Sequence, residues 1–129
     1  MSQENVEIVR AGYTAFAQGD LTAVVGLIAE NIIIEGQITP DGQPAQGREG
    51  LLANVKRVGE AFEDLTYEPV ELIDLGERVL ARVRVSGTGR EGIRGELNFG
   101  QLWTFKRGRA VRVHNYTLWE DAINAVGLI

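Results

Sequence analysis

Residues 97–118 read LNFGQLWTFKRGRAVRVHNYTL, and this stretch carries the clearest structural signal in the chain. Up to Phe105, apolar or aromatic side chains occupy most of the alternate positions, and a second run begins at Ala110. A period of two is typical of a strand that buries one face. The Arg107-Gly108 pair between the runs favours a turn, so the stretch predicts two antiparallel strands. The residues predicted to face inward on the first strand are Leu97, Phe99, Gln101, Trp103 and Phe105.

The register of this hairpin decides what the last strand, predicted over 110–118, presents to the core. A three-residue loop at 106–108 would turn Val113 and Asn115 inward, opposite Gln101 and Phe99. A two-residue turn would instead bring Arg112, His114 and Tyr116 inside, because a slip of one residue exchanges the two faces. We favour the first register because it buries valines and leaves Arg112 and His114 in water.

The chain upstream continues the same pattern. Residues 79–86 alternate, with Val79, Ala81, Val83 and Val85 on the inner face and Arg82 and Arg84 on the outer face. Gly76 predicts a turn from an earlier strand around 70–73, and the glycine-rich segment 87–95 predicts a hairpin loop. The C-terminal half is therefore a run of antiparallel strands, followed by a short helix at 119–127.

The N-terminal half has helical spacing. Apolar residues recur every three or four positions over 5–18, after Asp20, and over 48–62. Gly19 suits the end of the first helix, and Asp20 suits the cap of the second. Residues 32–34 predict a short strand, and the proline- and glycine-containing segment 38–47 predicts a loop. Three helices followed by antiparallel strands predict an α+β fold with helices on one face of a curved sheet.

Composition limits the functional classes. The length of 129 residues predicts a single domain over 1–129, and the absence of cysteine with only one histidine argues against thiolate or histidine-rich metal sites. We expect no metal and no cofactor. The net charge of −5 argues against nucleic-acid binding. Without a signal peptide or a long apolar run, we expect a cytoplasmic protein with no membrane contact.

Several short segments, in this order, resemble the SnoaL-like (polyketide cyclase-like) branch of the superfamily that also holds nuclear transport factor 2, ketosteroid isomerase and limonene epoxide hydrolase. They are 6–10 (VEIVR), 19–21 (GDL), 29–32 (AENI), 47–50 (GREG), 103–109 (WTFKRGR) and 119–128 (WEDA to GL). The resemblance implies a cone-shaped α+β barrel with three N-terminal helices packed on a strongly curved, mainly antiparallel sheet. It also implies a pocket between the helices and the concave face. It does not imply one chemistry, because one fold carries many functions.

The positions that carry catalytic groups in those enzymes hold other residues here. The base of ketosteroid isomerase corresponds to Gly36, and its oxyanion-binding acid to Gln101. The acid/base of the polyketide cyclases and one acid of limonene epoxide hydrolase correspond to Asn115. The arginine and second acid of that hydrolase correspond to Val83 and Val85. An amide cannot take up a proton near neutral pH, so these routes lack their base.

Three side chains remain as catalytic candidates. They are Tyr13, near the isomerase's oxyanion-donating tyrosine, Glu35, and His114, whose ordinary pKa suits acid/base work. The expected pocket residues are Tyr13, Phe16, Ile34, Val83, Val85, Phe99, Gln101, Trp103, Val113 and Asn115. Gln101 and Asn115 would either contact a ligand, or pair with each other or with water.

The leading hypothesis is therefore a protein that binds a small hydrophobic molecule. Alternatives are an isomerase, cyclase or hydrolase acting on a polyketide-like or cyclic substrate, and a non-catalytic dimerisation domain. We also expect a homodimer, because Leu80, Leu102 and Tyr116 lie among arginines on the predicted outer face.

Overall fold

A curved six-stranded sheet with helices on both faces makes up the part of the chain described by the computed structural model, residues 2–36, 45–89 and 91–128. The helices are α1 (Ser2–Ala17), α2 (Leu21–Gly26), α3 (Gly47–Ala61) and α4 (Trp119–Ala125). The strands are β1 (Ile28–Gly36), β2 (Ala45–Gln46), β3 (Phe62–Asp74), β4 (Arg78–Gly89), β5 (Arg94–Lys106) and β6 (Arg109–Tyr116). The predicted α+β class is confirmed.

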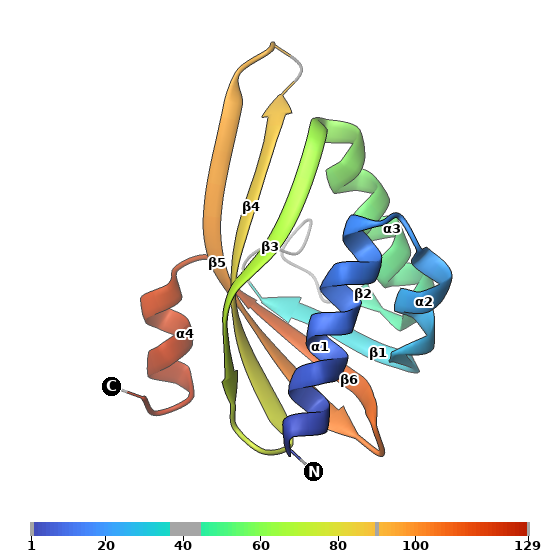
Figure 1. Cartoon of the computed structure of the whole chain (residues 1–129), viewed down its shortest axis with the longest axis vertical. Coiled ribbons are helices and arrows are strands. Elements are labelled where there is room, and N and C mark those ends of the chain that lie inside the picture. The colour runs from blue at the N-terminus through green and yellow to red at the C-terminus, as the bar shows by residue number, and fades with distance from the viewer. Residues whose placement is uncertain (1, 37–44, 90, 129) are drawn as a thin grey trace.

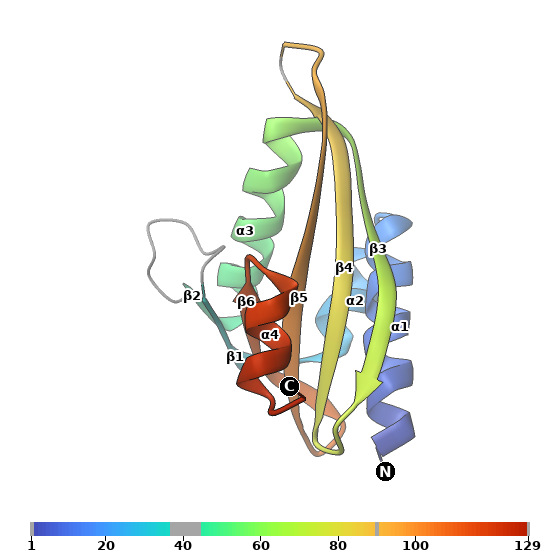
Figure 2. The ribbon, with the colours of Figure 1, turned by 90° about the vertical axis from the view of Figure 1, so that its left-hand side faces the viewer.

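The strands follow the order β2-β1-β6-β5-β4-β3, so β2 and β3 form the two edges and the sheet does not close. The sheet is strongly curved (Figure 1). All neighbours are antiparallel except β1 and β6, which run parallel. Helices α1–α3 cover the concave face, whereas α4 lies on the opposite face, and the β4–β5 hairpin extends beyond the helices (Figure 1). Figure 2 shows the same two layers from the side of α4. This is the expected cone with an open seam.

Most predicted elements occur, with longer strands than expected. Asp20 caps α2 as predicted, since its carboxylate accepts a hydrogen bond from the Ala23 N–H at 3.1 Å. The strand predicted at 32–34 runs over the whole of β1, and the loop predicted over 87–95 is shorter because β4 reaches Gly89 and β5 starts at Arg94. Of the loop predicted at 38–47, positions 38–44 lie outside the described residues.

The β5–β6 hairpin differs from the predicted register. Its turn has two residues, Arg107 and Gly108, both with positive φ, and Phe105 pairs with Ala110 rather than Arg109. That turn alone would have brought Arg112 and His114 inside. A β-bulge at Val111 inserts one extra residue, which restores the phase of the strand.

As a result Val113 and Asn115 face inward as predicted, although their predicted partners are wrong. Trp103 pairs with Val113 and Gln101 with Asn115. Val113 and Asn115 are buried, with exposed fractions of 1% and 4%.

Two apolar clusters hold the layers together. The main core lies between α1 and the concave face and is centred on fully buried residues such as Ile32, Ile34 and Val83. A second cluster lies under α4, where Ala122 packs on Leu80 and Leu102. Leu80 and Leu102 were expected at a dimer interface, but they are 0% and 9% exposed because α4 covers them. The composition of the outer face therefore gives less reason for a dimer than the sequence suggested.

Gly100 sets how closely α4 approaches the sheet. A Cβ at this position would lie 2.6 Å from the Cβ of Ala122. We expect Gly100→Ala to push α4 outward and to lower the free energy of unfolding by about 1–3 kcal/mol, the usual cost of overpacking. The measurement is urea unfolding. Gly95→Ala on the same strand is the matched control, because a Cβ there meets nothing within 4 Å. Adding Ala122→Gly to Gly100→Ala should recover part of the loss, and equal stability of the two alanine variants would contradict the close approach.

Candidate functional site

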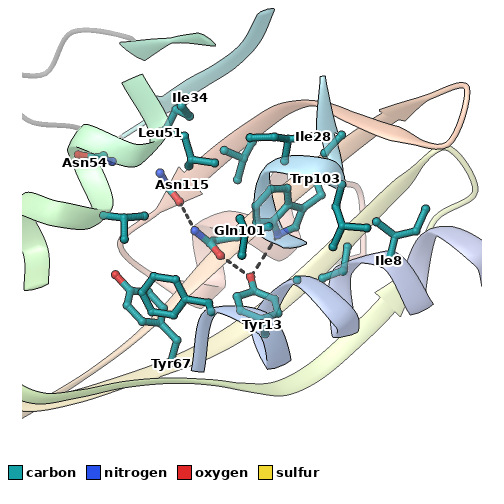
Figure 3. A pocket seen from close by; sticks show the side chains of 18 of the residues that line it. Ile8, Tyr13, Ile28, Ile34, Leu51, Asn54, Tyr67, Gln101, Trp103 and Asn115 are labelled. Carbon is teal, nitrogen blue, oxygen red and sulfur yellow. Dashed lines mark hydrogen bonds between the residues drawn. The ribbon is translucent and has the colours of Figure 1, made fainter. Parts of the chain in front are cut away.

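A cavity of about 130 Å³ lies between α1–α3 and the concave face of the sheet. Its described lining is almost entirely apolar, with a few amide and phenol groups and no charged side chain (Figure 3). Seven of the ten residues expected at the pocket from the sequence line this cavity: Tyr13, Phe16, Ile34, Gln101, Trp103, Val113 and Asn115.

The other three expected residues face the same side but lie beside the cavity, within or against the core. Val83 and Phe99 are buried in the main core, and Val85 packs against it. The ring of Tyr67, from β3, packs edge-on against Phe99 with centroids 6.4 Å apart and against Phe16 at 4.8 Å. Tyr67 therefore lines the cavity where Phe99 was expected.

Four polar side chains form a continuous hydrogen-bonded chain along the wall of the cavity (Figure 3). The indole Nε1 of Trp103 donates to the hydroxyl oxygen of Tyr13 at 3.1 Å. The Tyr13 hydroxyl donates to Oε1 of Gln101. Nε2 of Gln101 donates to Oδ1 of Asn115 at 2.9 Å. Of the alternatives left open for the two inward amides, the structure has them paired with each other, and this pair connects to both aromatic residues.

The hydrogen-bonded chain of these four side chains holds no group that titrates near neutral pH. Burial raises the pKa of the Tyr13 hydroxyl, and this outweighs the opposing effect of the hydrogen bond from Trp103. Tyr13 therefore stays protonated, and it can donate a hydrogen bond but cannot act as a base. Burial also raises the pKa of Tyr67.

Among the lining residues that carry a polar side-chain group, two were not expected from the sequence. Asn54 lies on α3 and Tyr67 on β3, and both face the cavity in Figure 3. The spacing already contained the signal for Asn54, because it lies three residues after Leu51 on the apolar face of the helix. Tyr67 gave no such signal, because β-bulges on β3 interrupt its alternation.

Gly36 lies at the end of β1, opposite Asn115 on β6. Its φ is +109°, and a Cβ there would lie 2.2 Å from the backbone oxygen of Asn115. The position that corresponds to the isomerase base therefore has no room for any side chain while β1 and β6 stay paired.

The other two catalytic candidates lie away from the cavity. Glu35 bonds Arg112 at 2.6 Å and lies 3.4 Å from Nδ1 of His114, whose ring stacks on Tyr116. Burial raises the pKa of the Glu35 carboxyl, but the hydrogen bonds and charges of Arg112 and His114 outweigh it and hold the pKa below its usual value. None of these four residues is among the cavity's lining residues. Glu35 and His114 thus form part of an ion-pair cluster, and of the three candidates only Tyr13 lines the cavity.

Among the described residues, no cluster of three or more histidine, cysteine, aspartate or glutamate side chains is arranged to hold a metal ion. Within the same residues, no helix is both long and apolar enough to cross a membrane. The chemistry that the cavity offers is apolar contact plus hydrogen bonding from amides and phenols.

Solved structures with this architecture include a nuclear transport factor 2-like protein of unknown function from Burkholderia pseudomallei. It is 25% identical, with a TM-score of 0.78 over 96% of this chain and 98% of that one. TerC, co-crystallised with polyporic acid, is 21% identical, with a TM-score of 0.79 over 95% and 96% of the two chains. A proposed polyketide cyclase from Xanthomonas campestris is 23% identical, with a TM-score of 0.75 over 98% of each chain.

No curated protein matches the chain in sequence. The family model described as the SnoaL-like domain matches residues 9–113, which is most of the chain. The matched region runs from α1 to β6 and includes almost all of the cavity described above. The chain therefore belongs to the SnoaL-like domain family.

Proposed function

We propose that this protein binds a small apolar molecule in the cavity between α1–α3 and the sheet and does not transform it by acid/base catalysis. The observation that carries the proposal is the uncharged cavity wall, in which the hydrogen-bonded chain ends on the amides of Gln101 and Asn115. An apolar pocket with a few convergent polar groups is typical of small-molecule sites.

The volume of the cavity limits the size of the ligand. An engineered apolar cavity of about 150 Å³ in another protein binds benzene. A cavity of about 130 Å³ is therefore matched to roughly one six-membered ring. A larger ligand would have to extend out of the cavity between the helices or displace side chains of α1 or α3.

The test uses benzene as the probe and Gly12 as the place to close the cavity. Gly12 lies on α1 in the cavity lining, and a Cβ there meets only Leu27 at an ordinary 3.8 Å. Gly12→Leu should fill the space with a helix-compatible side chain, and Gly12→Ala is the matched control. We expect benzene to raise the thermal unfolding midpoint of the wild type and of Gly12→Ala, because a ligand that binds only the folded state stabilises it.

Gly12→Leu should show little or no such rise. If saturating benzene leaves the wild-type midpoint unchanged, or stabilises Gly12→Leu equally, the cavity is not the binding site. Native mass spectrometry of the purified protein would add the identity of any ligand that co-purifies.

A second candidate is an enzyme that isomerises, cyclises or hydrolyses a polyketide-like or cyclic substrate. The similarity to a proposed polyketide cyclase favours it. It needs a proton acceptor, and the only titratable groups in the described lining are Tyr13 and Tyr67, both with raised pKa. We expect no turnover of a Δ5-3-ketosteroid or of limonene epoxide, and turnover abolished by mutating Glu35 or His114 would favour the enzyme.

We also propose a homodimer and a cytoplasmic location. Tyr116 packs against the cluster under α4 but is only half-buried, and its ring stacks on His114 beside the Glu35–Arg112 ion pair, a mixture found at interfaces. Sedimentation showing only a 14.1 kDa species at tens of micromolar would contradict the dimer.

A further inference from the structure

The hydrogen-bonded chain in the cavity has a direction, and Trp103 sets it. An indole N–H only donates, so the Tyr13 oxygen must accept from Trp103. The proton of Tyr13 is then available for Oε1 of Gln101. With its oxygen engaged, Gln101 turns Nε2 towards Asn115, whose Oδ1 accepts.

The reversed arrangement is unfavourable. If the Gln101 amide were rotated by half a turn, two N–H groups would point at the Tyr13 oxygen and the Tyr13 proton would lose its acceptor. Tyr13 is 8% exposed, and burying a donor without a partner is costly. Because burial raises the pKa of this phenol, losing the proton does not relieve the conflict. The direction is thus dictated by a donor-only group at one end.

This direction determines which atom Asn115 exposes at the other end of the hydrogen-bonded chain. Since Oδ1 of Asn115 is used by Gln101, the amide nitrogen Nδ2 is the group that Asn115 turns away from Gln101. In Figure 3 it lies on the side of Leu51 and Asn54, within the cavity lining. The hydrogen-bonded chain therefore presents an N–H donor to a bound molecule at this point.

From this polarity we infer that the cavity selects a neutral, ring-sized molecule with a carbonyl or ether oxygen, which accepts a hydrogen bond from Nδ2 of Asn115. The inference rests on the proposed binding function and specifies its ligand class. Neutrality follows from the lining, because a charged ligand would lose its hydration without meeting an opposite charge. A molecule that only donates would leave the Asn115 N–H without a partner.

The experiment measures the dissociation constants of three probes by calorimetry. Cyclohexanone carries an acceptor, methylenecyclohexane has nearly the same shape without one, and pyrrole only donates. The two six-membered rings differ in hydration, so the informative quantity is the ratio of their dissociation constants, compared between the wild type and variants. This comparison cancels the difference in transfer from water.

Asn115→Leu should shift that ratio by about tenfold or more against cyclohexanone, the effect of one lost hydrogen bond in a buried site. Asn98→Leu is the matched control, because it makes the same change at an exposed position of β5 outside the cavity lining, so the ratio should stay within about twofold. Trp103→Phe removes the group that sets the direction, and we expect it to weaken the ketone preference and improve pyrrole binding.

A second measurement does not depend on any variant being folded. In the wild type, the side-chain NH₂ resonances of Asn115 should shift with cyclohexanone and much less with methylenecyclohexane at equal saturation. Equal shifts, or a ratio unchanged by Asn115→Leu, would overturn the inference and leave the binding function standing. If none of the probes, benzene included, binds the wild type, the binding function itself fails and the inference fails with it.

Discussion

Replacing Gly36 by alanine should lower the free energy of unfolding by about 2–4 kcal/mol, at the upper end of single-residue effects. Two causes combine. The φ of +109° is one that L side chains rarely adopt, and the new Cβ would meet the Asn115 backbone at 2.2 Å, which only a separation of β1 from β6 could relieve.

Gly19→Ala separates the two causes. Gly19 also has positive φ, at +72°, but a Cβ there meets nothing within 4 Å. We expect this control to lose only the conformational cost of about 1–2 kcal/mol. Equal losses at Gly19 and Gly36 would show that the close approach to β6 is not real. Both variants are measured by urea unfolding, with the same slope of free energy against urea concentration for each.

The same geometry decides whether a catalytic base can be restored. Gly36→Asp places a carboxylate at the position that corresponds to the isomerase base, but it carries the same clash as alanine. We therefore expect Gly36→Asp to be at least as unstable as Gly36→Ala. A stable Gly36→Asp would contradict this account, whether or not it gained activity.

The strand faces were predictable where one face is buried along the whole strand. On β4 the alternating valines reported the buried side directly, and the outward arginines stayed outside: Arg84 pairs with Glu68 and Arg82 lies over Trp119. The local signal and the tertiary environment agree there, so periodicity alone is sufficient.

The predictions were wrong where backbone irregularities or distant elements intervene. A bulge such as the one at Val111 leaves no sequence mark, and it changes the partners of every later residue on the strand. The bulges on β3 likewise hid Tyr67, and this residue, rather than Phe99, completes the cavity wall. Leu80 and Leu102 looked like interface residues because nothing in their own strands predicts that α4 folds back over them.

The candidate site was partly predictable for a related reason. Gln101 and Asn115 stood out as polar residues on apolar faces, and a buried amide must find a partner. Their connection to Tyr13 and Trp103 depends on α1 crossing the sheet at one place, and no single segment encodes that crossing. The donor-to-acceptor direction of the hydrogen-bonded chain depends on contacts between elements that only the assembled fold brings together. The proposed ligand chemistry depends on the same contacts.

Converting Asn115 to aspartate tests the placement of this site with a pH-dependent readout. The two side chains are nearly the same size, so the fold should tolerate Asn115→Asp. The carboxyl would be buried in a lining without basic groups, since Asn115 is 4% exposed. Burial should raise its pKa above about 3.9 by about 1–3 units, and the hydrogen bond from Gln101 should oppose only part of that shift.

A pKa that is raised in the folded state makes the free energy of unfolding depend on pH, and the direction of that dependence is fixed. Between the unfolded and folded pKa values the folded protein binds more protons than the unfolded chain, so the free energy of unfolding falls as the pH rises. Relative to its value below pH 4, Asn115→Asp should lose about 1.4–4 kcal/mol as the pH rises through the folded pKa. The wild type lacks this group and should lack this step.

Thermal or urea unfolding from pH 4 to 8 measures the difference between variant and wild type. Asn98→Asp is the matched control, because it makes the same chemical change on β5 at an exposed position opposite Arg84. A cation beside an exposed carboxyl favours the charged form of that carboxyl. The stability of this control, relative to the wild type, should therefore stay constant or increase as the pH rises. If Asn115→Asp behaves like Asn98→Asp, residue 115 faces water, the bulge at Val111 has been misplaced, and His114 becomes the inward residue. A loss confined to Asn115→Asp would show that the side chain of residue 115 is buried in the uncharged cavity lining, as the proposed ligand chemistry requires.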